Sequence, residues 1–69
     1  MKEFLKQVQE IFPEAIYEKQ LNSIIFIAKN ENCFIHKLDA HFKFYIAGKC
    51  RRKSKDFQKI LVALKAIKK

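Results

Sequence analysis

Hydrophobic residues recur at helical spacing near both ends of the chain. Near the amino terminus this spacing predicts a helix that ends at Phe12, because Pro13 disfavours the helical conformation of the residue before it. Near the carboxyl terminus, Ser54 is a favourable N-cap and Asp56 suits the first turn, so a second amphipathic helix is predicted there. The apolar stripes consist of Phe4, Leu5, Val8, Ile11 and Phe12 in the first helix and of Phe57, Ile60, Leu61, Leu64 and Ile67 in the second.

Between these helices lie three runs rich in Ile, Phe and Tyr, which are residue types that favour β-strands. Short polar gaps separate the runs and are tight enough for hairpins, so neighbouring runs are expected to pair in antiparallel fashion. The runs span residues 23–29, 33–38 and 41–47, and the gaps lie at residues 30–32 and 39–40.

Residues 15–20 are ambiguous, because they fit either a short edge strand or a helical turn started by Pro13. The chain is close to the lower size limit for a domain that folds on its own apolar core. We therefore expect a single α+β domain over residues 1–69. Its predicted order is a helix, a three-stranded antiparallel meander and a C-terminal helix, with a fourth strand if residues 15–20 join the sheet.

A two-residue turn at Asp39 and Ala40 sets the register of the second predicted hairpin. The resulting pairs are Leu38 with His41, His36 with Lys43, and Phe34 with Tyr45. Because side chains alternate between the two faces of a strand, the remaining strand residues share the opposite face and form the core beneath the helices. This predicted core face comprises Ile24, Phe26, Ala28, Cys33, Ile35, Phe42, Phe44 and Ile46.

The other face of the predicted sheet carries an apolar patch with polar residues at its rim. Such patches on small proteins usually mark interfaces, so this face is a candidate surface for a partner protein or for a homodimer. The alternative is that one helix covers each face, and a register slip of one residue would exchange the two faces. The residues of this candidate surface are Ile25, Ile27, Phe34, His36, Leu38, His41, Lys43 and Tyr45.

Composition adds a strong positive charge to this picture. The chain has 15 Lys+Arg against 7 Asp+Glu, which gives a formal net charge of +8 at pH 7. The cations concentrate in residues 49–55, a segment that we call the basic run. A surface of this kind favours a polyanion, and its adjacent arginines suit phosphate because a guanidinium binds phosphate bidentately. The candidate phosphate-binding residues are Lys49, Arg51, Arg52, Lys53, Lys55 and Lys59.

The last third of the chain resembles the final helix of double-stranded RNA-binding domains, which begins with Ser-Lys-Lys followed by a further lysine and spaced alanines. The length and the order of helix, three strands and helix also match that family. The resemblance implies that Lys55 and Lys59 bind phosphates across the major groove, and it favours RNA over DNA. Asp56 stands where the family has its second lysine, and residues 30–32 replace its Gly-Pro-x-His loop. The matching residues are Ser54, Lys55, Lys59, Ala63, Ala66 and Ile67.

Cysteines and histidines supply the residue types of a zinc site, at Cys33, His36, His41 and Cys50. Strand alternation places Cys33 and His36 on opposite faces, so we expect neither a metal site nor a cofactor. Either histidine has the chemistry of a general base on RNA, but no nucleophile and no orienting carboxylate is clearly placed beside it. We therefore expect a binding protein and not an enzyme, and we assign no catalytic residue.

The longest uncharged apolar run, residues 21–28, is too short to cross a bilayer, and no signal peptide is apparent. Two cysteines in a small chain without such a signal fit a reducing compartment better than a disulfide framework. The sequence therefore predicts a cytoplasmic protein without a membrane partner.

Two functions from different classes fit these observations. The first is a small basic nucleic-acid-binding module that contacts phosphates at the basic start of its last helix, with duplex RNA as the more specific version. The second is an inhibitor or regulator that binds another protein, similar in format to the small proteins that phages and mobile elements encode, anti-CRISPR proteins among them. Such a protein would bind an acidic protein surface or use the apolar patch.

Overall fold

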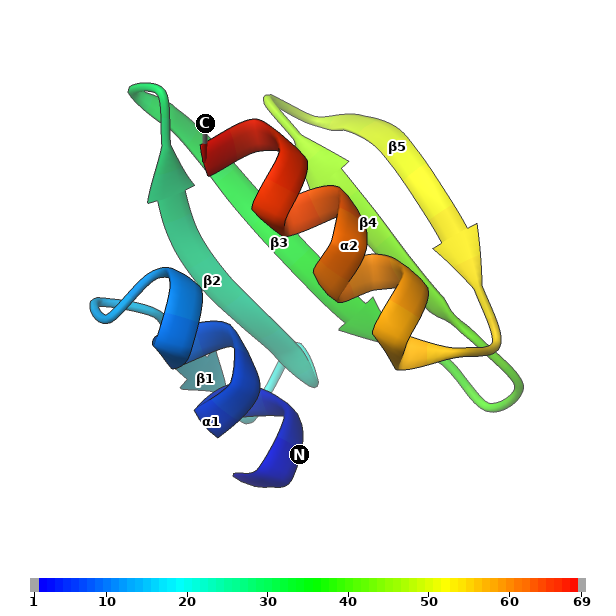
Figure 1. The fold of residues 1–69 in the computed structure, drawn as a ribbon. Coiled ribbons are helices and arrows are strands. Elements are labelled where there is room, and N and C mark those ends of the chain that lie inside the picture. Colours follow the sequence, from blue (N-terminus) through cyan, green and yellow to red (C-terminus); the bar gives the residue numbers. More distant parts are fainter. Residues whose placement is uncertain (1, 69) are drawn as a thin grey trace.

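The computed structural model describes residues 2–68, in which a five-stranded antiparallel sheet is flanked in the sequence by two helices (Figure 1). The predicted α+β class is confirmed, whereas the predicted number of strands, three or four, was wrong. The elements are α1 Lys2–Ile11, β1 Ile16–Glu18, β2 Ser23–Ala28, β3 Glu31–Lys37, β4 Phe42–Ile46, β5 Lys49–Ser54 and α2 Phe57–Lys68.

The strands follow one another across the sheet in chain order, from β1 at one edge to β5 at the other. The register predicted for β3 and β4 is confirmed, since Phe34 pairs with Tyr45 and His36 with Lys43. Beyond these pairs, the Leu38 N–H donates to the carbonyl of His41 at 2.8 Å, which closes the two-residue turn.

Two other hairpins turn through residues with positive φ. Lys29 and Asn30 join β2 to β3 with φ of 53° and 64°, and Ala47 and Gly48 join β4 to β5 with φ of 51° and 82°. Positive φ at both central residues is what a type I′ turn requires, and this turn matches the twist of the flanking strands. The second of these turns folds the basic run back against β4.

The fifth strand therefore contains all of the basic run except Lys55, whereas the sequence predicts this segment at the start of the last helix. Its residues are mostly cations and show no apolar alternation, so hydrophobic patterning does not reveal it. An edge strand is formed by backbone hydrogen bonds to one neighbour, and the side chains of β5 remain largely exposed. At the other edge, residues 16–18 form the short strand β1, which was one of the two alternatives for that segment.

Both helices lie on the same face of the sheet (Figure 1), so the alternative of one helix on each face is wrong. Aromatic rings connect the layers: Phe12 of the α1 end stacks on Phe26 with ring centroids 4.7 Å apart, and Phe4 meets Phe42 edge-on at 5.1 Å. The predicted core face is buried as expected, with Ile46 only partly so. We call the opposite, helix-free side of the sheet the open face.

The last helix begins slightly later than predicted. Asp56, and not Ser54, is its N-cap, because the Asp56 Oδ1 accepts from the N–H of Gln58 at 2.9 Å. Ser54 ends β5, and its Oγ accepts from the Asp56 N–H at 3.0 Å, which shapes the turn into the helix. Consequently, of the basic run only Lys55 lies next to a helix amino terminus.

Candidate nucleic-acid interface

Strand pairing divides the cations of β5 between the two sides of the sheet edge. Arg52 is paired with the core residue Phe44 and so lies on the helix side, whereas Lys53 is paired with Lys43 on the open face. A bulge between Phe44 and Tyr45 places one extra residue, Arg51, in β5. The six predicted phosphate-binding residues are all exposed, but they form two groups instead of one cluster.

The first group borders a groove between β5 and α2 on the helix side. Arg51 and Arg52 line this groove, which has a volume of about 450 Å³, together with apolar residues of β4 and α2. Lys59 belongs to this side as well, because it precedes Ala63 by four residues and so shares its face of the helix. The apolar lining consists of Phe44, Ile46, Val62, Ala63, Ala66 and Ile67.

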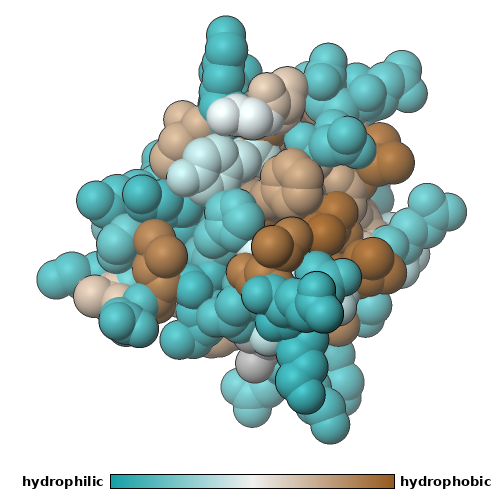
Figure 2. Space-filling model, turned by 180° about the vertical axis from the view of Figure 1, so that it is seen from behind, coloured by the Kyte–Doolittle hydropathy of each residue, from teal (hydrophilic) through white to brown (hydrophobic). Residues whose placement is uncertain are grey.

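The second group belongs to the open face, where paired residues form two rows across the strands. The first row is mainly apolar and aromatic, and the second ends in two lysines on β4 and β5. Figure 2 views this side and shows brown and tan side chains gathered at and to the right of its centre, with teal polar side chains around them. The first row contains Ile16, Ile25, Phe34, Tyr45 and Cys50, and the second contains Glu18, Ser23, His36, Lys43 and Lys53.

Three rings meet at the centre of the open face. Phe34 and His36 lie nearly parallel, with centroids 5.9 Å apart and planes inclined by 2°, and Tyr45 meets His36 edge-on at 5.1 Å. The buried Ser23 holds His36 in place through its Oγ, which contacts the His36 Nδ1. Since the only proton of this hydroxyl is donated to the Leu21 carbonyl at 2.9 Å, the His36 Nδ1 is the donor to Oγ.

His41, in the turn that follows β3, lies in a strongly positive environment. Its Nε2 is buried and has no hydrogen-bond partner among residues 2–68. Burial lowers the pKa of His41, and the charges of Lys53, Lys43 and Lys55 lower it further. All three lysines thus add positive potential at one imidazole, and two of them, Lys43 and Lys53, are paired on the open face.

We expect the stability of the protein to fall as the pH drops below about 6.5, the usual pKa of histidine. His41 has a lowered pKa in the folded state, so between the folded and unfolded values the unfolded chain binds more protons. The contribution of His41 to the free energy of unfolding is then fully present above about pH 6.5 and is lost as the pH falls below that value. Urea unfolding between about pH 5 and pH 8 measures this, with the variant His41→Asn as the comparison. An equally steep decline in the variant would contradict the assignment to His41.

The structure places the strand residues of the predicted partner face on one side of the sheet, and it places Leu38 and His41 in the turn that follows β3. Leu38 lies at the tip of the β3–β4 hairpin, while Ile25, Phe34 and Tyr45 form one continuous row. Sequence reasoning missed Ile16, which extends this row to the β1 edge and is 58% exposed. The signal for Ile16 in the sequence was the alternative of an edge strand at residues 15–20, but its side chains were not assigned to a face of the sheet.

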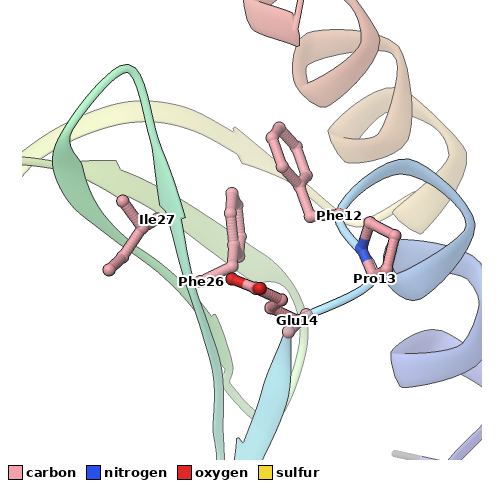
Figure 3. Close-up of a pocket in the computed structure, with 6 residues that line it drawn as sticks. Phe12, Pro13, Glu14, Phe26 and Ile27 are labelled. Atoms are coloured by element: carbon pink, nitrogen blue, oxygen red, sulfur yellow. The ribbon is translucent and has the colours of Figure 1, made fainter.

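A separate cleft of about 230 Å³ lies at the end of α1, next to β2 (Figure 3). Figure 3 shows the rings of Phe12 and Phe26 side by side, with Pro13 and Glu14 at the chain turn. Glu14 is the only ionisable residue among those that line the cleft. The cleft is near the β1 and β2 side of the sheet, away from β5, and its carboxylate does not suit an anionic ligand.

Cys33 and Cys50 are both free, the first buried in the core and the second exposed on β5. Burial raises the pKa of the Cys33 thiol, which makes it a poor metal ligand in its protonated form. Among residues 2–68, no three His, Cys, Asp or Glu side chains are grouped closely enough to hold a metal ion. The described helices also include none with the length and apolar character needed to cross a membrane.

Comparison with protein-family models, with curated proteins and with solved structures found no match to this chain. The resemblance to double-stranded RNA-binding domains therefore stays a prediction.

Proposed function

We propose that the protein binds nucleic acid and contacts its phosphates through the cations of β5 together with Lys55 and Lys59. The observation that carries this proposal is the composition of the β5 edge. Four of its six residues are exposed Lys or Arg, and neither β4 nor β5, both described in full, contains a carboxylate. Like charges held this close repel one another, and a bound polyanion relieves that repulsion.

The division of these cations between two sides is compatible with a phosphate chain that follows the edge. Arg51 and Arg52 are available from the helix side, and Lys53 from the open face. Guanidinium groups bind phosphate bidentately, whereas ammonium groups act as point charges, so the arginines supply orientation and the lysines supply attraction. Contacts of this kind give affinity with little sequence preference.

Fluorescence anisotropy with labelled duplex RNA, duplex DNA and single strands, each titrated across salt concentrations, tests the proposal. Four to six phosphate contacts correspond to a log–log slope of about −3 to −5, because each contact contributes about −0.7 to −0.9. Binding that is insensitive to salt, or no binding even at low salt, would overturn it.

A second candidate function is the binding of a partner protein, and one observation favours it. Ile16 and Ile27, at the β1 and β2 side of the open face, are 58% and 65% exposed. Exposed aliphatic side chains grouped on one face are typical of protein contacts. Such a partner would dock on the apolar half of the open face, far from the groove that Arg51 and Arg52 border.

A further inference from the structure

The open face combines two chemical features in neighbouring rows. Phe34 and Tyr45 are paired directly across β3 and β4, and two positions further along the same strands His36 is paired with Lys43. Two residues along a strand span about 6.8 Å, so the row of rings and the row of cations are direct neighbours on this face. Both rings are only partly buried, which leaves part of their surface free for a ligand.

The cations next to these rings are unusually placed. Lys43 and Lys53 are directly paired across β4 and β5, an arrangement of like charges that is unfavourable in a sheet. His41 directly precedes β4, and its Nε2 is buried without a hydrogen-bond partner among residues 2–68. No carboxylate lies on the open-face positions of β3, β4 or β5, all of which the structure describes, and Glu18, in the same row, lies on β1 at the opposite edge of the sheet.

We propose that the open face binds single-stranded nucleic acid, with bases stacked on Phe34 and Tyr45 and the adjoining phosphates held by Lys43 and Lys53. This inference rests on the proposed function and specifies its ligand. His36 of the second row lies parallel to Phe34 of the first, and its Nδ1 contacts the Oγ of Ser23.

The same features argue against a duplex as the ligand of this face. In a duplex, each base is paired and stacked between its neighbours, so its flat surface is not available to a protein ring. Single strands expose these surfaces, and stacking on aromatic side chains contributes to their binding whatever the base. A partner protein fits the open face less well, because the two paired lysines would need carboxylates placed opposite them.

The test combines affinity with an optical probe that the chain already provides. The chain has two tyrosines, Tyr17 and Tyr45, and no tryptophan, so the variant Tyr17→Phe leaves Tyr45 as its only tyrosine. Tyr17 is on the opposite side of the sheet from Tyr45, because it is paired with the core residue Ile24. In this variant, binding of a short single-stranded oligonucleotide is expected to quench the Tyr45 emission.

Anisotropy then compares that oligonucleotide with the duplex it forms with its complement. We expect the single strand to bind more tightly than the duplex. The variants Phe34→Leu and Tyr45→Leu keep apolar bulk but remove the ring, and each should lower the affinity for the single strand by about 5-fold to 100-fold. The double variant Lys43→Gln/Lys53→Gln should lower the steepness of the salt dependence by about two. Ile27→Ser, a change in the apolar half of the same face, is the matched control and should leave the affinity unchanged. Thermal melting establishes that each variant is folded.

The outcomes separate this inference from the proposed function. Equal affinity for duplex and single strand, with no effect of the two Leu variants, would overturn the inference while the β5 cations keep their role. Failure of every nucleic acid to bind at low salt would overturn both. If Ile27→Ser instead abolishes an association of the protein with itself, measured by sedimentation, the open face is a protein interface and the inference is wrong.

Discussion

Nucleic-acid binding is expected to weaken by about 100-fold or more in a variant that carries Arg51→Glu, Arg52→Glu and Lys55→Glu. At exposed positions each lost phosphate contact costs about 1 kcal/mol, so three contacts correspond to a factor of roughly 150. The introduced carboxylates add repulsion to this loss. The log–log salt slope should also become shallower by about three. Anisotropy across salt concentrations measures both quantities.

The matched control reverses three exposed lysines elsewhere, Lys2→Glu, Lys6→Glu and Lys19→Glu, so that both variants have the same formal net charge. Lys2 and Lys6 are on α1, and Lys19 lies in the turn after β1. If binding depends on the β5 edge, the control keeps most of the affinity at moderate salt. Equal losses in the two variants would mean that net charge alone attracts the nucleic acid, and would contradict a localised site.

The largest effect on stability is expected from Phe44→Ala, which should leave the chain mostly unfolded at room temperature. Phe44 is 1% exposed at the centre of β4, and its ring stacks on Phe26 with centroids 6.1 Å apart. Replacing a buried Phe by Ala costs about 3–5 kcal/mol. A core in a domain of this size rarely provides more than about 3–5 kcal/mol in total, so this loss is as large as the whole free energy of unfolding.

Far-UV circular dichroism and urea unfolding measure this effect. The control is Val62→Ala on α2, where the side chain is 62% exposed and little buried contact is lost. A change of no more than about 0.5 kcal/mol is expected there. A Phe44→Ala variant that unfolds at the same urea concentration as the original protein would show that the core is not organised around β4.

Much of the fold follows from local patterns in the sequence. The alternation in β2, β3 and β4 separates core from open-face residues, because successive side chains of a strand point to opposite sides. The two-residue turn at Asp39 and Ala40 then determines the register of β3 and β4, as the pairing of Phe34 with Tyr45 confirms. Proline and the helical spacing likewise define the end of α1 within one residue.

The candidate site was less predictable, because its key residues lie in a strand without apolar patterning. In the linear sequence, Arg52 and Lys53 are neighbours and read as one cationic cluster. In the sheet they lie on opposite sides of β5, since strand geometry turns successive side chains apart. The signal available in the sequence was the Ala47–Gly48 turn, which favours a hairpin and thereby a strand on each side of it.

Local patterns along the chain are enough to establish which residues share each face, where both helices lie and how large the excess of positive charge is. That both helices cover the same face, and that the basic run pairs with β4, follows only from the three-dimensional arrangement of the chain. The physical reason is that side-chain alternation depends on local geometry alone. What covers a face, and whether a polar segment joins a sheet edge, depend instead on long-range packing and on backbone hydrogen bonds, which any sequence can make.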